Sequence, residues 1–233
     1  MGILAFAVAA LVGCGDPGSD LSDGSTPADA ASPCEWSDVA TRADGRVVGG
    51  PFATLVVSFT PGAGATFGHS ALPDIVLGPP QGAGDLRGGI DVVSLGRGGE
   101  IVLAFDGEII DGPGDDFVVF ENAFTVPGVE ERFWEELGEV SVSVDGTTWV
   151  SFSCAAQGAR PHPGCAGWTP VYASPTSGLC ALDPRVSGGD LFDLAAVQIP
   201  RARFVRIRDL ATQGITAPAT GFDLDAVGVI HGQ

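Results

Sequence analysis

The chain has 233 residues, enough for one substantial domain, and its 11 basic and 29 acidic residues give a formal net charge of -18 at pH 7. This charge repels nucleic acid and anionic lipid surfaces, so we expect no nucleic-acid partner. Apolar residues make up 45% of the chain and charged residues only 17%, a balance that favours a folded core over disorder.

The start of the chain has the layout of a secretory leader. Residues 3–12 form an apolar run that is too short to span a bilayer and is followed by small residues and a cysteine. The tetrad Leu11-Val12-Gly13-Cys14 resembles the lipobox of bacterial lipoproteins, in which the cysteine is lipidated. The resemblance implies an exported protein of the cell envelope, facing the periplasm or the cell surface. Its membrane partner would be engaged through lipid on Cys14, with residues 1–14 as signal peptide and lipobox.

The residues after the lipobox do not form a folded core by their composition. Up to about Pro33 they are Gly, Asp, Ser, Pro, Thr and Ala with a single Leu, which cannot repay the entropy of ordering by burial. We therefore expect a flexible tether over residues 15–45 and one domain over residues 46–233.

Four cysteines remain once Cys14 carries lipid, an even number that predicts two disulfides in an exported chain. They permit three pairings, and spacing alone does not choose among them. Cys154 with Cys165 is the most local pair, and Cys34 with Cys180 would then tie the start of the domain to its body; this is the pairing that we predict. A zinc site is the alternative, but the chain has no C-x-x-C pair and only His162 is near these cysteines.

The domain reads as short β-rich runs separated by Gly, Pro and Asp clusters. In Glu139–Val144 valines alternate with polar residues, as expected for a strand with one dry face, and Asp145-Gly146 is a strong hairpin turn signal. One short helical segment is expected near 130–137, because Phe133 and Leu137 are four residues apart. The predicted strands are Thr54–Phe59, Asp91–Leu95, Glu100–Phe105, Asp116–Glu121, Glu139–Val144, Trp149–Ser153, Ala195–Ile199, Arg203–Asp209 and Ala226–Ile230.

Two of these segments resemble a known fold family. Val142 to Trp149 is similar to the "strand, Ser/Asp-Gly turn, Trp" hairpin of discoidin-like modules, and Ala202 to Ile207 to their later "aromatic-Val-Arg-Ile" strand. The resemblance implies an all-β, galactose-binding-like jelly-roll sandwich. A group of uncharacterised bacterial cell-surface lipoprotein domains is also similar, over about Val47 to Ile230, through the segments Val76–Pro80, Gly98–Leu103, Asp116–Asn122 and Gly221–Val227.

Acidic residues suggest a cation site. Carboxylates and amides are what a hard cation binds, since calcium takes six to eight oxygen ligands. Asp223 and Asp225 are two apart, so in an extended segment they face the same way while Leu224 faces the core. Galactose-binding-like modules frequently hold a structural calcium, which the resemblance implies here as a cofactor. The predicted ligands are Asp116, Glu121, Asp223 and Asp225, with Asp115 and Asn122 as secondary members.

Two other interpretations of these acids remain open. In a chain with 29 acidic residues, Asp occurs in turns for backbone reasons. Two carboxyl groups can also serve as general acid and base in a glycoside hydrolase. The usual catalytic patterns fail: there is no G-x-S-x-G, H-E-x-x-H or P-loop, so no catalytic residue is assigned and we expect no enzyme.

Ligand contacts are expected at three residues. Trp168 lies in the loop after Cys165 and is the exposed tryptophan candidate for stacking on sugar rings. Arg206 and Arg208 would share the outer face of a strand if Val205 points inward, although a solvated strand face that balances nearby acids explains them as well. The sequence therefore predicts a non-catalytic module that binds carbohydrate or another surface ligand; the alternatives are a structural or adhesive protein-interaction domain and a glycoside hydrolase.

Overall fold

The computed structural model describes residues 34, 39–41, 47–129, 132–212 and 220–233. The leader 1–14, its Cys14 and most of the expected tether lie outside the described residues, so those predictions stay predictions. The described residues all belong to one unit, Ala31–Gln233. Among them, no helix is long and apolar enough to cross a membrane.

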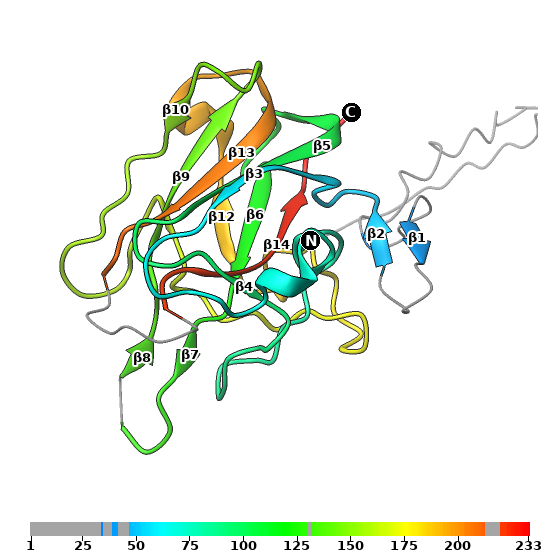
Figure 1. Cartoon of the computed structure of the whole chain (residues 1–233). Helices are drawn as coiled ribbons and strands as arrows, with labels where there is room; N and C mark the ends of the chain where they lie inside the picture. The colour runs from blue at the N-terminus through cyan, green and yellow to red at the C-terminus, as the bar shows by residue number, and fades with distance from the viewer. Residues whose placement is uncertain (1–33, 35–38, 42–46, 130–131, 213–219) are drawn as a thin grey trace, which may run out of the picture. The chain divides into compact units, whose positions relative to one another are not determined.

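The larger sheet has six strands and every pairing in it is antiparallel (Figure 1). Its central strand, β13, lies between β9 and β5, and both β10 and β11 pair with β9. The strand order is β10 (Val150–Ser151), β9 (Gly138–Ser143), β13 (Arg201–Asp209), β5 (Glu100–Ile110) and β3 (Leu55–Thr60), with β11 (Cys165–Ala166) beside β9.

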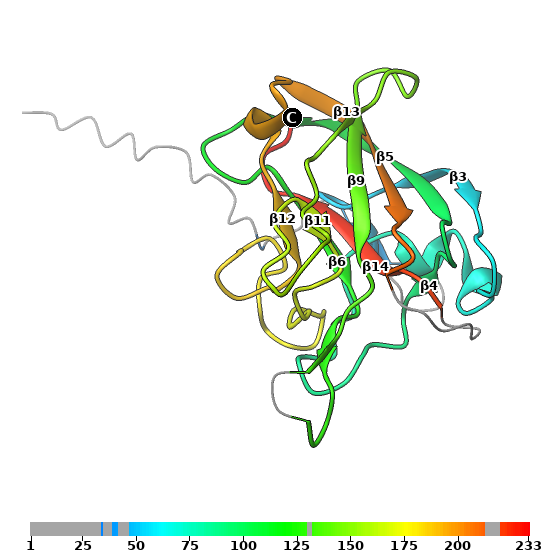
Figure 2. The same ribbon diagram turned by 90° about the vertical axis from the view of Figure 1, so that its left-hand side faces the viewer.

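A second, four-stranded antiparallel sheet faces the first, and Figure 2 shows the two layers. Its order is β12 (Asp190–Phe192), β6 (Phe117–Glu121), β14 (Asp223–Val229) and β4 (Val93–Ser94). Two smaller antiparallel pairs complete the strands: β1 (Val39–Thr41) with β2 (Val47–Gly49), and β7 (Phe124–Thr125) with β8 (Phe133–Trp134). The fold is therefore an all-β sandwich, as predicted.

The core has two parts because the smaller sheet is covered on both faces. Phe117 and Val119 of β6 point between the sheets, whereas Val118 and Phe120 point to the opposite face, where loops cover them. All four side chains are fully buried. A strand buried on both faces reads as a continuous apolar run, which is why β6 is recognisable in the sequence.

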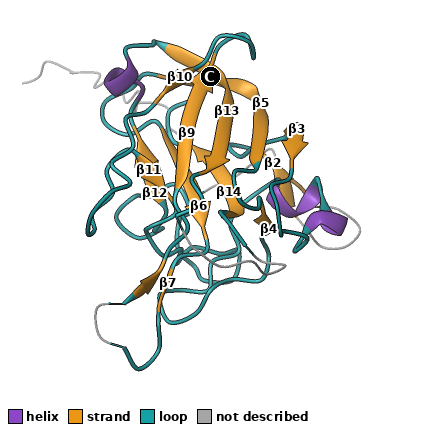
Figure 3. Ribbon diagram, turned by 60° about the vertical axis from the view of Figure 1, so that its left-hand side comes forward, coloured by secondary structure: helices purple, strands orange, loops and turns teal. Residues whose placement is uncertain are grey.

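One predicted strand is wrong. Ala195–Ile199 contains instead the 3-10 helix η3 (Leu194–Val197). The side chain of Asp193 accepts a hydrogen bond from the Ala195 N–H at 2.8 Å, which caps the turn, and Gln198 ends it with a left-handed φ of 58°. The other 3-10 helices are η1 (His69–Ala71) and η2 (Asp74–Val76), and Figure 3 shows how little helix accompanies the strands.

The helical segment expected near 130–137 is also wrong. Residues 130–131 lie outside the described part, and Phe133 and Trp134 form β8, paired with β7. The rings of Trp134 and Phe124 stack across this ribbon at 6.4 Å, and the Arg160 guanidinium lies 3.7 Å from the centre of the Phe133 ring. Neighbouring side chains thus find partners on opposite sides, which is the period of a strand and outweighs a single i,i+4 apolar pair.

Both predicted disulfides are present. Cys34 is bonded to Cys180, and Cys154 to Cys165. The second bond closes the loop that carries Arg160 and His162. Disulfides form and persist in oxidising compartments, which agrees with the expectation of export.

Candidate cation-binding site

The site lies where three neighbouring strands of the smaller sheet meet. Glu121 is the last residue of β6 and lies opposite Leu224 of β14, while Asp223 lies opposite Ser94 of β4. Asn122 follows Glu121 directly. The pairing register therefore brings together four of the predicted ligands, Glu121, Asn122, Asp223 and Asp225.

A bulge in β14 sets the position of Asp225. Leu224 is opposite Glu121 and Ala226 is opposite Phe120, so Asp225 is the extra residue on its strand. Leu224 enters the core between the sheets, as predicted, and Ala226 packs in the cluster on the other face. Both carboxylate oxygens of Asp225 accept a hydrogen bond from the Gln81 N–H, each at 3.0 Å.

The segment Gln81–Gly89, here called the strap, covers this end of the sheet. Its Gly82 and Gly84 N–H groups donate to the carbonyl oxygens of Ala173 and Val171 at 3.0 and 2.9 Å. Asn122 Nδ2 donates to the Gly89 carbonyl at 3.2 Å. A Cβ atom on Gly88 would lie 2.3 Å from Asn122 Oδ1, so the strap backbone passes directly over that oxygen. The glycines thus let the strap close the site.

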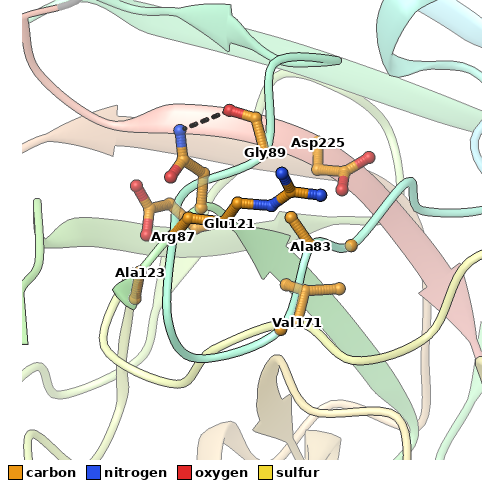
Figure 4. A pocket seen from close by; sticks show the side chains of 10 residues that line it. Ala83, Arg87, Gly89, Glu121, Ala123, Val171 and Asp225 are labelled. Atoms are coloured by element: carbon orange, nitrogen blue, oxygen red, sulfur yellow. Dashed lines mark hydrogen bonds between the residues drawn. The ribbon is translucent and has the colours of Figure 1, made fainter. Parts of the chain in front are cut away.

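Between the strap and the sheet lies a small pocket of mixed polar and apolar lining (Figure 4). The pocket is small and has room for about one water molecule or ion. Its walls are Gly82, Ala83, Gly84, Arg87, Gly89, Glu121, Asn122, Ala123, Val171 and Asp225.

Two acceptor oxygens in the pocket residues lack a donor. Glu121 is 2% exposed, and within the described residues neither its Oε2 nor Asn122 Oδ1 has a hydrogen-bond partner. Glu121 Oε1 accepts from the Asp223 N–H at 3.4 Å. Leaving a buried acceptor unsatisfied destabilises a fold by about 1–3 kcal/mol, and more if it is charged, so these oxygens favour a hydrogen-bond donor, a proton or a cation as partner.

Asp223 supports the site from the next strand. One of its oxygens accepts a hydrogen bond from the Ser94 hydroxyl, and Oδ2 accepts from Asn122 Nδ2 at 3.3 Å. The Asn122 amide therefore directs its nitrogen toward Asp223 and Gly89 and leaves its oxygen as the free acceptor. The oxygen and nitrogen of an amide have nearly the same shape, so their positions are assigned from the hydrogen bonds that each makes.

Acidic side chains crowd behind the pocket and raise one another's pKa. Burial, followed by the charges of Asp223 and Glu136, raises the pKa of Glu121 well above its usual range. Burial is also the main cause that raises the pKa of Asp223 to about 7 and, together with the Asp223 charge, that of Glu136 to about 8. Such a group of carboxylates is stable only with protons or with a cation among them.

The remaining predicted ligands lie at the opposite end of β6. Asp116 precedes that strand, and its oxygens accept hydrogen bonds from Gly112 N and Leu194 N, each at 2.7 Å, and from His231 Nδ1 at 2.9 Å. It anchors loops. Burial and the charges of Asp193 and Asp116 raise the pKa of the half-buried Asp115. The predicted ligand set therefore separates into two groups.

The second group also has acids close together. Asp111, Asp116 and Asp193 each offer a carboxylate oxygen, and these three oxygens lie within 4.8 Å of one another. Asp111 is exposed, and the oxygens of Asp116 already have three donors. Close carboxylates alone do not distinguish a cation site from a capped loop, so the pocket with donor-free oxygens is the stronger candidate.

Sequence reasoning missed several members of the pocket region. Gln81 acts through its backbone N–H, which no side-chain pattern reveals, and Ser94 and Glu136 lie far from the acids in sequence. Glu136 accepts from Gly221 N at 2.9 Å, and Asp190 from Gly167 N and Trp168 N at 2.6 and 3.1 Å. Burial raises the pKa of Asp190 to about 6. For Glu136 and Asp190, the sequence offered one indication of burial, namely that each acid adjoins apolar residues.

Trp168 is half-buried in a separate cluster. Its indole Nε1 donates to the Cys165 carbonyl at 3.1 Å, and the Arg160 guanidinium lies 5.5 Å from its ring and 3.7 Å from that of Phe133. Glu135 pairs with Arg160 at 3.5 Å and with the buried His162 at 3.1 Å. These contacts fix the position of the Trp168 ring beside the disulfide loop and leave part of its surface exposed.

Arg206 and Arg208 lie on the larger sheet, with Val205 and Ile207 buried as predicted. The Arg206 guanidinium lies 4.6 Å from the centre of the Trp149 ring, donates to Ser141 Oγ at 3.3 Å and is 3.8 Å from Glu100. Arg208 is exposed. These contacts favour the interpretation that Arg206 and Arg208 lie on a solvated strand face and balance nearby acids.

The fold is an all-β sandwich with a small pocket at one end of its smaller sheet, lined in part by Glu121, Asn122 and Asp225. No protein-family profile matches the chain, and no curated protein does. A solved structure that resembles it is the crystal structure of the C-terminal domain of a chitobiase from Bacteroides fragilis, at 12% identity and a TM-score of 0.35. The match covers 84% of this chain and 98% of that one.

Proposed function

We propose that this chain is an exported, lipid-anchored envelope protein whose sandwich is a non-catalytic ligand-binding module stabilised by calcium. The observation that carries the proposal is the pocket in which Glu121 Oε2 and Asn122 Oδ1 are buried without a donor. Its two further parts, the anchor at Cys14 and the ligand, rest on the lipobox resemblance and on the exposed part of Trp168.

Calcium fits the chemistry of the pocket. The side-chain ligand atoms are oxygens from Glu121, Asn122 and Asp225, and glycines of the strap line the same pocket. Calcium accepts six to eight oxygen ligands, water included, at flexible geometry, whereas zinc prefers nitrogen and sulfur. Asp223 would act as a positioning residue because Ser94 and Asn122 already engage its oxygens.

Burial argues for an ion and against a reacting polymer. Glu121, Asp223 and Asp225 are 2%, 5% and 4% exposed, and the pocket holds one small particle. A glycoside hydrolase needs two carboxyl groups on either side of a scissile bond, with room for the sugar. This burial supports a cation-binding role for the three acids over a catalytic one.

Calcium titration by calorimetry tests the proposal. We expect saturable binding at one site, a higher melting temperature with calcium than with EGTA, and loss of both effects in Glu121→Gln. Asp111→Asn, which alters the acidic group at the other end of β6, is the matched control and should bind as wild type does. Equal melting temperatures with calcium and with chelator, together with no heat of binding, would refute the calcium site.

The ligand is tested on two separate faces. We propose carbohydrate as the ligand class, with Trp168→Ala abolishing binding on a glycan array while Arg206→Gln retains it. The reverse result would place the ligand on the larger sheet. A specific protein captured by the intact envelope protein, with no glycan bound, would favour the adhesive alternative. Turnover of glycosides that is lost in a folded Asp225→Asn variant would overturn the non-catalytic assignment.

A further inference from the structure

One exposed aromatic side chain lies beside the strap, that of Tyr172. It is 41% exposed, whereas its neighbours Val171 and Ala173 are both buried. This alternation is that of an extended segment, in which successive side chains point to opposite faces. Val171 lines the pocket (Figure 4), so the Tyr172 ring points outward, away from the packed side of the same segment.

The backbone holds Tyr172 from two sides. The Gly82 and Gly84 N–H groups of the strap donate to the carbonyl oxygens of the residues that flank Tyr172. The Tyr172 N–H donates to the Ser187 carbonyl oxygen at 2.9 Å, and a Cβ atom on Gly188 would lie 3.0 Å from Cδ2 of the ring. Because the ring rests against this backbone, a ligand that stacks on it would order little that is not ordered already, which lowers the entropic cost of binding.

Two charged residues act on the Tyr172 hydroxyl. Burial raises the pKa of Tyr172, the charge of Asp85 raises it further, and the charge of Arg160 lowers it. Both charged groups are therefore close to the phenol. Asp85 is an exposed residue of the strap, and its carbonyl oxygen accepts a hydrogen bond from Thr125 N at 2.7 Å, which holds the strap against β7. Tyr172 thus has an exposed carboxylate beside it.

Arg160 connects Tyr172 with Trp168. Its guanidinium lies 5.5 Å from the centre of the Trp168 ring and acts on the Tyr172 phenol, so both partly exposed rings are its neighbours. The Arg160 Nε is 3.5 Å from a carboxylate oxygen of Glu135, which balances the charge of the guanidinium. Trp168, Tyr172, Arg160 and Asp85 therefore belong to one surface, here called the aromatic rim.

The chemistry of the aromatic rim suits a neutral sugar. An aromatic ring packs against the apolar C–H face of a sugar, and a carboxylate accepts hydrogen bonds from sugar hydroxyls. Because Glu135 balances Arg160, the charge of Asp85 leaves the rim negative on balance, which repels a sugar that carries its own carboxylate. The net charge of -18 on the whole chain acts in the same direction.

We propose that Tyr172 and Asp85 complete the ligand site at Trp168: Tyr172 stacks on a neutral sugar ring, and Asp85 accepts hydrogen bonds from the hydroxyls of that sugar. This inference rests on the carbohydrate binding proposed above. It adds two contact residues to the site and a selection of neutral over acidic glycans.

The test uses an array of neutral glycans and glycans that contain uronic acid, with affinities measured by calorimetry for those that bind. We expect wild type to bind neutral glycans only. Tyr172→Ala should lower the affinity about tenfold or more, and Tyr172→Phe less than about threefold, because the ring remains. Phe67→Ala is the matched control, since it removes a ring of similar exposure, 37%, from the loop before η1, and it should bind as wild type does.

Asp85→Asn tests the polar half of the site and, because the side chain is exposed, decides the matter even where Tyr172→Ala fails to fold. It should weaken the binding of neutral glycans about fivefold and allow uronic-acid glycans to bind. Wild-type affinity in Tyr172→Ala and Asp85→Asn, with binding lost in Trp168→Ala, would overturn this inference and leave the proposed function intact. A preference of wild type for acidic glycans would also overturn it, and a wild type that binds no glycan would overturn both proposals.

Discussion

Glu121 is the residue on which the chemistry of the pocket depends most. Its carboxylate is buried, one oxygen has no donor among the described residues, and nearby acids add to the cost of its charge. Because its pKa is raised in the folded state, Glu121 lowers stability increasingly as pH rises from its ordinary value toward the folded one. Without a bound cation, the ionised Glu121 therefore lowers the stability of the folded state.

Replacement of Glu121 by Gln should therefore have opposite effects with and without calcium. In chelator at pH 8, Glu121→Gln should be more stable than wild type by about 1–2 kcal/mol, because the amide removes the ionisable group. In calcium the order should reverse, because a ligand is lost. Urea unfolding in the two buffers measures both values; a variant that is less stable in both would mean that Glu121 acts only through packing.

Two adjacent glycines test whether the strap closes the site. A Cβ at position 88 would lie 2.3 Å from Asn122 Oδ1, whereas at position 89 the nearest atom is the Gln81 carbonyl oxygen at an ordinary 3.6 Å. Gly88→Ala should displace the Asn122 oxygen and weaken calcium binding about tenfold or more, and Gly89→Ala should leave it near wild type. Equal affinities in the two variants would separate the strap from ion binding.

At the scale of single residues, the sequence indicated which side chains could bind a cation better than it indicated which of them lie close together in the fold. Glu121, Asn122, Asp223 and Asp225 could be proposed together because two short motifs carry them all. Asp116 could not be separated from them, since only the strand direction places it at the other end of β6. No sequence pattern assigned Arg87 or Gly88 to the pocket, because the strap reaches the pocket residues only in the folded chain.

Among the elements, β6 contributes most to the packing of the smaller sheet. Phe120 points away from the larger sheet into the second cluster and is fully buried. Phe120→Ala should destabilise the domain by about 3–5 kcal/mol, whereas Ile90→Ala, at a position 83% exposed, should change stability by less than about 0.5 kcal/mol. Chemical denaturation of both variants checks the contrast, and a small effect at Phe120 would mean that the loops do not cover this face.

The elements that the sequence predicted well are those whose apolar pattern is set by the sheet itself, such as β6 and β9. Two errors arose where another interaction outweighed a pattern. Asp193 caps a 3-10 turn where apolar residues indicated a strand, and Phe133 and Trp134 follow strand geometry where a four-residue spacing indicated a helix. Neither the cap nor the ring partners Phe124 and Arg160 can be inferred from local periodicity.

For the molecule as a whole, the buried acids predict how stability depends on pH. Burial raises the pKa of Asp190 to about 6, of Asp223 to about 7 and of Glu136 to about 8. The folded state therefore binds more protons than the unfolded state between about pH 4 and pH 8, so stability should fall as pH rises through this window.

With chelator present, we expect the free energy of unfolding to be lower at pH 8 than at pH 5 by more than about 2 kcal/mol. Calcium should reduce the difference, because the cation takes the place of the protons in the pocket. Denaturation curves at both pH values, with and without calcium, provide the measurement. A stability that is flat or rises toward pH 8 in chelator would mean that these carboxylates are not buried in the way the fold indicates.

Anomalous X-ray diffraction from crystals grown with calcium shows directly whether the pocket binds the ion. We expect one strong anomalous peak in the pocket, within ligand distance of Glu121 Oε2, Asn122 Oδ1 and the Asp225 carboxylate. A peak among Asp111, Asp116 and Asp193 with none in the pocket, or no peak at saturating calcium, would contradict this expectation.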